Sequence, residues 1–195
     1  MTYLNQFLKT LEQLKSNNAV EIKHFEIGES YDVESIENLI ESMGFPPFPK
    51  EIVAFLAEIS LLELDWADKT GEIEGTLRVK PLEYILGNSK DHALKLFPDM
   101  DEESRADLEH FFFVENSNEN LLLGFLTNES SDNTLYFLQN GFDGFLKSSV
   151  NYKTYFTRMV QTAGIINWDQ SLLYPGTPQH QKMESDLKKL KLIDL

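Results

Sequence analysis

The sequence predicts an α+β fold, a single domain with an antiparallel sheet of about six strands flanked by helices. Apolar residues recur with helical spacing near the start of the chain and again after residue 149. Between these regions lie short apolar and aromatic runs, which polar loops of hairpin length separate. The chain has 195 residues, 42% of them hydrophobic, enough for one core of ordinary density. Strands grouped together, with helices before and after them, are typical of the α+β class.

The first 60 residues contain three predicted helices and one strand. Residues 4–16 carry leucine and phenylalanine at helical spacing. Residues 19–27 predict a strand with a bulge near His24, because the apolar residues change phase there. Asp32 or Ser35 then caps a second helix. The third helix follows a proline-rich loop.

A hairpin over residues 61–79 is the first β feature in the middle of the chain, with its turn near residues 69–71. Pro81 opens a short helix after the hairpin, because proline is tolerated at the start of a helix. Asp101 caps another helix over residues 102–109.

An antiparallel meander follows, in runs over residues 111–115, 121–127 and 134–138. Phe142 and Phe145 extend it in this prediction. Ser149 caps a long helix that ends near Gly164. The pattern places these large apolar residues in the core: Phe45, Phe55, Leu56, Phe112, Leu123, Phe137, Phe156 and Met159.

A linker of proline and glycine divides the predicted domain, residues 1–174, from a tail over residues 175–195. Met183, Leu187 and Leu190 give the tail a narrow apolar stripe, so we expect an amphipathic helix there. The pattern leaves open whether this helix docks on its own domain or on another molecule.

The net charge of −15 is concentrated in one part of the chain. Residues 21–119 hold 24 acidic and 8 basic side chains, a net charge of −16. Such a field repels nucleic acid and anionic lipid and attracts basic proteins. We therefore expect a basic protein partner, no nucleic acid and no membrane. Solubility alone is the alternative explanation of the charge.

The residues needed for common catalytic and metal sites are missing or badly spaced. The chain has no cysteine, and His24, His92, His110 and His180 are not spaced three or four residues apart as on one face of a helix. An acidic run that begins at residue 99 resembles a calcium loop, but Ser104 stands where that loop needs glycine. There is no phosphate loop and no serine elbow. We therefore expect no enzyme activity, no metal and no cofactor.

The absence of cysteine fits a reducing compartment, and the first residues lack the basic and apolar regions of a secretory signal. We therefore expect the protein in the cytoplasm. The 32 acidic residues leave a carboxylate-dependent hydrolase open as an alternative function.

The proline-rich loop and its two helices carry a resemblance to a known family. Residues 43–56 read Met-Gly-Phe-Pro-Pro-Phe-Pro-Lys-Glu-Ile-Val-Ala-Phe-Leu, in which Gly44 ends one helix and Pro49 suits the first turn of the next. This joint resembles that of the SUKH superfamily, which contains bacterial immunity proteins and fungal cell-wall regulators. Residues 135–138 and 148–156 also resemble the family's last strand and helix. Residues 58–60 depart from it, with Glu-Ile-Ser where the family commonly has Asn-Gly-Gly.

The resemblance covers about residues 30–165, so residues 2–27 would be an addition to a SUKH-like core. It implies a non-catalytic binding protein with no catalytic residues to assign. An immunity protein that binds and neutralises a cognate bacterial toxin, such as one acting on nucleic acid, is the first expectation. A regulatory scaffold of the cell-wall type is the alternative.

The predicted hairpin contains the first candidate binding surface. Trp66 lies among Asp65, Asp68, Glu72 and Glu74. These carboxylates would form an acidic edge for a basic partner, with Trp66 as an anchor if it is exposed. The alternative is that Trp66 points into the core, as large aromatic side chains usually do.

Overall fold

Antiparallel strands form two sheets in the computed structural model, which describes residues 2–118, 120–128, 134–139 and 144–192. The first sheet has the order β1, β2, β3, with bounds Val20–Ile27, Leu62–Asp68 and Glu74–Val79. The second has the order β4, β5, β6, β7, with bounds Phe111–Asn118, Leu121–Leu126, Thr134–Gln139 and Leu146–Asn151. The predicted α+β class is confirmed. The strands form sheets of three and four, where one sheet of about six was expected.

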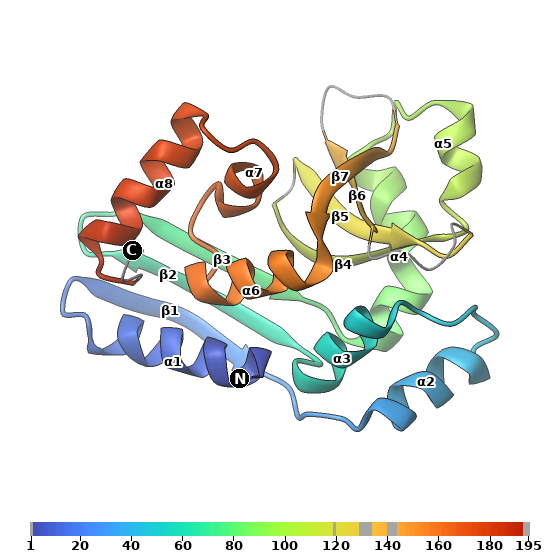
Figure 1. Ribbon diagram of the computed structural model, residues 1–195, viewed down its shortest axis with the longest axis horizontal. Coiled ribbons are helices and arrows are strands. Elements are labelled where there is room, and N and C mark those ends of the chain that lie inside the picture. The colour runs from blue at the N-terminus through green and yellow to red at the C-terminus, as the bar shows by residue number, and fades with distance from the viewer. Residues whose placement is uncertain (1, 119, 129–133, 140–143, 193–195) are drawn as a thin grey trace.

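Helices cover both sheets (Figure 1). Their bounds are α1 Tyr3–Ser16, α2 Val33–Ser42, α3 Lys50–Glu58, α4 Leu82–Leu96, α5 Glu102–Asp107, α6 Tyr152–Thr162, α7 Trp168–Leu173 and α8 Pro178–Lys189. In Figure 1, α6 lies in front of the sheets, where it packs against α1, α3 and α7, and α4 packs behind β4. α2 lies at the periphery and packs chiefly against α3.

The segment after α6 explains why the strands do not form one sheet. The backbone N–H of Thr76 in β3 donates to the carbonyl of Gly164 at 2.8 Å, and that of Ile166 donates to the carbonyl of Glu74 at 2.9 Å. These bonds occupy part of the β3 edge at which another strand would pair. β3 and β4 are therefore close together but belong to different sheets. In the sequence, α4 and α5 connect β3 to β4.

The bulge predicted near His24 is present in β1. Ile22 lies opposite Trp66 and His24 lies opposite Asp65, so Lys23 is the extra residue between them. The extra residue changes the phase of the strand. Apolar residues on both sides of the bulge therefore face the core, while His24 faces outward.

The helix boundaries around the proline-rich loop agree with the prediction. The Asp32 carboxylate accepts a hydrogen bond from the backbone N–H of Ser35 at 2.8 Å, so Asp32 is the cap of α2. Gly44 has φ of 79°, the left-handed conformation that closes a helix at low cost. Pro49 lies directly before α3, at the cap position.

The prediction that Ser149 caps the final helix is wrong. Residues Leu146–Asn151 form β7, the edge strand beside β6, and the Asn151 side chain caps α6 by accepting from the backbone N–H of Thr154 at 2.9 Å. The serine pair in this stretch has the composition of a cap, but cross-strand pairing decides its conformation. The predicted contribution of Phe142 and most of the polar loop before Thr134 lie outside the described residues.

Two helices differ from the prediction. α4 has 15 residues and continues to Leu96, where a short helix was expected, and α7 was not predicted. α8 confirms the amphipathic helix of the tail. Its apolar stripe is buried: Met183, Leu187 and Leu190 belong to the same continuous core as the two sheets. Asn17, just after α1, also donates to the Leu190 carbonyl at 2.9 Å. The tail therefore docks on its own chain.

Seven of the eight predicted core residues are buried, and Phe45 is half-buried. Phe55 of α3 and Phe156 of α6 stack at 3.9 Å between ring centroids. Tyr3 of α1 contacts both rings edge-on. This aromatic group joins three helices over the centre of the fold. Among the described helices, none combines the length and the apolar character required to cross a bilayer.

We expect Phe55→Ala to lower the free energy of unfolding by about 3–5 kcal/mol, because it removes a fully buried ring and leaves a cavity. Urea denaturation followed by circular dichroism measures this. Val33→Ala is the matched control, since Val33 is exposed, and we expect it to change stability by less than about 0.5 kcal/mol. A loss below about 1 kcal/mol for Phe55→Ala would contradict the packing described here.

Candidate functional site

A groove of about 420 Å³ lies where α2, the proline-rich loop and α3 meet. We call it the joint groove, and it is lined by Glu37, Ile40, Glu41, Phe45, Pro47, Phe48 and Val53. Gly44 produces it, because the left-handed turn reverses the chain and lays the loop between the two helices. The volume is within the range of binding sites for small apolar groups, about 300–1,000 Å³.

The floor of the joint groove is aromatic and rigid. The ring of Phe45 contacts that of Phe112 edge-on at 5.2 Å, and the ring of Phe48 contacts those of Phe112 and Phe125 at 4.9 and 4.6 Å. The loop between α2 and α3 is thereby fixed to β4 and β5. Such preorganisation lowers the entropic cost of binding.

The rim of the joint groove is acidic. Glu37 and Glu41 are exposed and lie one helical turn apart on α2. Over residues 24–49 the chain has six acidic residues and no lysine or arginine. All six are exposed, and none forms an ion pair with another described residue. Of these six, Glu37 and Glu41 line the groove, and neither has an ion-pair partner among the described residues.

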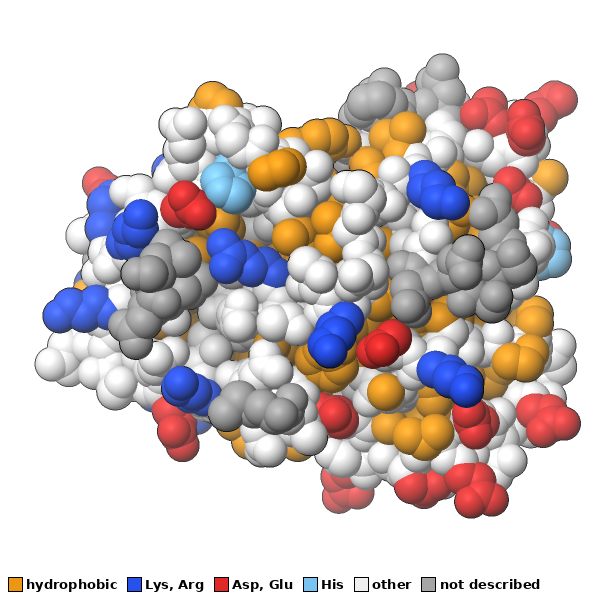
Figure 2. All heavy atoms as spheres, in the orientation of Figure 1, with side chains coloured by type: hydrophobic (Ala, Val, Ile, Leu, Met, Phe, Trp, Pro, Cys, Tyr) orange, Lys and Arg blue, Asp and Glu red, His pale blue; other side chains and the backbone are white. Residues whose placement is uncertain are grey.

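The apolar stripe of α2 extends beyond what α3 covers. Ile36 and Ile40 in its middle are buried, whereas Val33 and Met43 at its ends are 46% and 43% exposed. Tyr31, just before the helix, is 52% exposed. At the lower right of Figure 2, over α2 and the loop after it, apolar side chains lie among acidic ones, with a basic side chain beside them. An apolar surface with a polar border is typical of an interaction site.

The anchor proposed at the hairpin is not available to a partner. Trp66 is 1% exposed, and its indole N–H donates to the carbonyl of Ala163 at 2.8 Å. The ring lies against Gly75 on the next strand, where even a Cβ atom would collide with it. Of the two alternatives for Trp66, the core position is therefore the one observed.

The hairpin carboxylates do not form a single free edge either. Asp65 accepts two hydrogen bonds from Arg78, at 2.6 and 2.7 Å. Burial alone would raise the pKa of Asp65, but the bonds from Arg78 and Thr76 outweigh it and hold that pKa below its ordinary value. Asp68 accepts from the backbone of the hairpin turn. Glu72 and Glu74 are exposed, so two of the four predicted carboxylates remain accessible.

A second cavity, of about 560 Å³, lies between β3 and the segment from Gly164 to Gln170. Glu74 and Asp169 are among the residues that line it. Beneath it, the Tyr155 hydroxyl donates to Glu115 at 3.0 Å. Burial, together with the charges of Glu115 and Asp169, raises the pKa of Tyr155 well above its ordinary value. Glu115 is 1% and Asp169 2% exposed, so these acids belong to the interior more than to the cavity.

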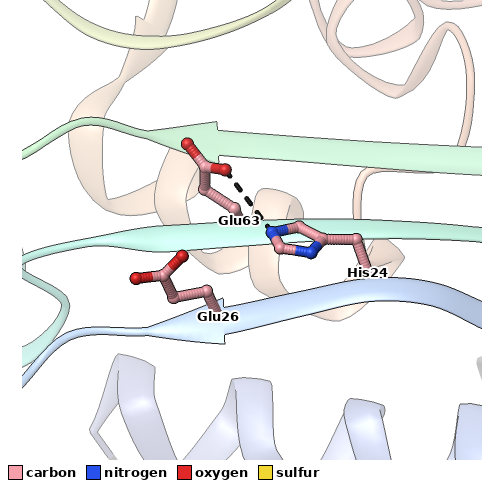
Figure 3. A group of neighbouring side chains, drawn as sticks. All are labelled: His24, Glu26 and Glu63. Atoms are coloured by element: carbon pink, nitrogen blue, oxygen red, sulfur yellow. Dashed lines mark ion pairs between the residues drawn. The ribbon is translucent and has the colours of Figure 1, made fainter.

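Three titratable side chains that the sequence does not bring together meet on the outer face of the first sheet. His24, Glu26 and Glu63 project from the same side of β1 and β2, and His24 points toward Glu63 (Figure 3). The His24 Nε2 and Glu63 Oε2 atoms are 3.5 Å apart. Lys80 also donates to Glu63, at 2.6 Å, and this bond holds the pKa of Glu63 below its ordinary value. The sequence criterion of helical spacing could not find this group, because strand pairing brings it together.

Comparison of the chain with family models, curated proteins and solved structures finds no match. The SUKH resemblance therefore depends on the sequence motifs alone. Sequence reasoning recognised the joint but did not recognise the groove beside it. The available signal was the unbroken acidity of residues 24–49 together with more apolar residues on α2 than one partner helix can cover.

We expect Gly75→Ala to lower the free energy of unfolding by about 1–3 kcal/mol, because the added methyl group must displace Trp66. Gly87→Ala is the control. Gly87 lies inside α4 with no atom within 4 Å of an added Cβ, so alanine there should raise stability by about 0.5–1 kcal/mol. Thermal and urea unfolding measure both, and a neutral Gly75→Ala would show that Trp66 does not need this close approach.

Proposed function

We propose that this protein is a non-catalytic binding protein that recognises a basic protein partner through the joint groove. The observation that carries the proposal is the combination of an apolar groove with an exposed acidic border on the same helix. Ile40, Phe45 and Val53 offer apolar contact, and Glu37 and Glu41 offer acceptors beside it. A segment with one large apolar side chain flanked by lysine or arginine complements this arrangement.

The charge and the apolar surface contribute differently to such binding. The carboxylates attract a basic partner over a distance and raise the association rate. The apolar groove supplies contact area that holds the partner once it has docked, because burial of an aromatic or aliphatic anchor excludes water. The groove also needs little rearrangement, since its floor is packed on the second sheet.

The resemblance to the SUKH superfamily supports a more specific form of the proposal. In that form the protein is an immunity protein of the cytoplasm that binds and neutralises a cognate bacterial toxin. A toxin domain that acts on nucleic acid is basic, so an acidic inhibitor would be steered to it. The same surface would also serve a regulatory scaffold of the cell-wall type, which is the alternative within this class.

A carboxylate-dependent hydrolase is the second candidate function, and one observation favours it. Glu74 and Asp169 line the same cavity, and hydrolases of this kind use two carboxylates that face one substrate. Asp169 is only 2% exposed, however, whereas a general acid or base must reach the proton that it transfers. The joint groove, with its exposed rim, supports binding more directly.

Site-specific photo-crosslinking in the native cell tests where the partner docks. A photoreactive amino acid in place of Glu37 should give a covalent product with a basic protein, which mass spectrometry then identifies. The same amino acid in place of Glu72, at the hairpin tip, is the matched control and should give none, since both positions are exposed carboxylates. A product from position 72 and none from position 37 would assign docking to the hairpin and contradict the proposal.

Binding kinetics with the crosslinked partner test the role of the rim. We expect Glu37→Gln with Glu41→Gln to lower the association rate constant by about tenfold at low salt, because steering by opposite charge weakens. The difference should shrink as salt shortens the screening length to about 10 Å at 0.1 M. The pair Glu72→Gln with Glu74→Gln removes the same charge from the hairpin and should have a smaller effect. Equal effects of the two pairs would mean that only net charge matters.

A further inference from the structure

The bulge in β1 determines which side chains share the outer face of the first sheet. His24 and Glu26 are two residues apart in the regular part of the strand, so they share a face, and the extra residue Lys23 makes that face the outer one although Ile22 points to the core. Glu63 of β2 lies directly opposite Glu26 in the register. Two neighbouring strands therefore present one imidazole and two carboxylates at one level of the sheet (Figure 3). Bulges are frequent where a strand must redirect a side chain toward a site.

The three groups are near enough to one another to share a metal ion. One potential ligand atom from each residue lies within 4.8 Å of the other two. His24 Nε2 and Glu63 Oε2 are 3.5 Å apart, longer than a good hydrogen bond. Bonds of about 2.0–2.2 Å to a tetrahedral zinc ion place neighbouring ligand atoms about 3.4 Å apart.

The register places two carboxylates, those of Glu26 and Glu63, opposite each other. Like charges directly opposite each other on one face of a sheet destabilise the pairing of the strands. Lys80 reaches Glu63 at 2.6 Å from one side and so compensates one of the two charges. Glu26 forms no ion pair with another described residue. A divalent ion between the three groups would compensate both carboxylates at once.

We infer that His24, Glu26 and Glu63 form a binding site for a divalent ion of the zinc class. An imidazole ligand favours zinc, cobalt or nickel over magnesium and calcium, which prefer oxygen ligands alone. Three protein ligands leave a coordination position for water or for a group from another molecule. The side chain of His24 is 47% exposed, so this position faces solvent. The site is distinct from the joint groove and does not depend on the function proposed for that groove.

Lys80 provides a sharp test, because it competes with the ion for Glu63. Removal of the Lys80 charge frees one carboxylate oxygen of Glu63. It also removes the repulsion between the Lys80 ammonium group and the metal ion. Lys80→Gln should therefore tighten metal binding, while substitution of a ligand should weaken it at least about tenfold, given that even outer-shell changes cost about 10–100-fold.

The experiment is calorimetric titration of the full chain, free of any polyhistidine tag, with zinc, cobalt, calcium or magnesium chloride. We expect one zinc ion per chain, similar binding of cobalt, and no binding of calcium or magnesium. His24→Gln and Glu26→Gln should each weaken zinc binding at least about tenfold. His180→Gln is the matched control. His180 pairs with the single carboxylate of Glu184 at 3.2 Å, so its loss should leave the affinity unchanged.

Nuclear magnetic resonance of the unsubstituted protein gives a second readout that does not depend on the folding of variants. On addition of zinc, the imidazole nitrogen signals of His24 should shift, and those of His92, His110 and His180 should not. Zinc should also raise the unfolding temperature of the unsubstituted protein but not that of His24→Gln. No zinc binding, shifts at another histidine, or a Lys80→Gln variant that binds no more tightly would each overturn the assignment.

Discussion

The structure depends on the contact between Trp66 and the segment that follows α6. The indole fills the space left by Gly75, and its N–H bonds to the carbonyl of Ala163. Gly164, with φ of 67°, then approaches Thr76 and Leu77 more closely than a residue with a side chain could. This contact attaches the end of α6 and the segment after it to the first sheet. Because α6 begins directly after β7 of the second sheet, the same contact fixes the two sheets relative to each other.

That dependence also shows what a sequence can and cannot predict here. The bulge near His24, the cap at Asp32 and the left-handed Gly44 follow from local chemistry, and each is present. The division into two sheets depends on which segment pairs with the edge of β3, a matter settled by residues some 90 positions away. Ser149 shows the same limit, because this residue suits a helix cap but lies in β7, the strand that pairs with β6.

The candidate sites differ in how far the sequence alone predicts them. Gly44 and the prolines predict the joint between α2 and α3, but they do not predict the groove beside it. The aromatic floor of the groove could not be predicted, because Phe112 and Phe125 come from strands far along the chain. The group of His24, Glu26 and Glu63 depends on strand register alone. Trp66 shows the reverse case, in which neighbouring acids suggested a surface but alternation along β2 placed the ring inside.

The peripheral position of α2 has a consequence for how recognition can change over time. Its inner residues, Ile36 and Ile40, are fixed by packing, but Val33, Glu37 and Met43 contribute little to the core. Substitutions at such exposed positions usually change stability by less than about 0.5 kcal/mol. Natural variation can therefore change the surface shape and charge of α2 while the rest of the fold keeps its structure and stability. A lineage under pressure to track a changing partner would accumulate its differences there first.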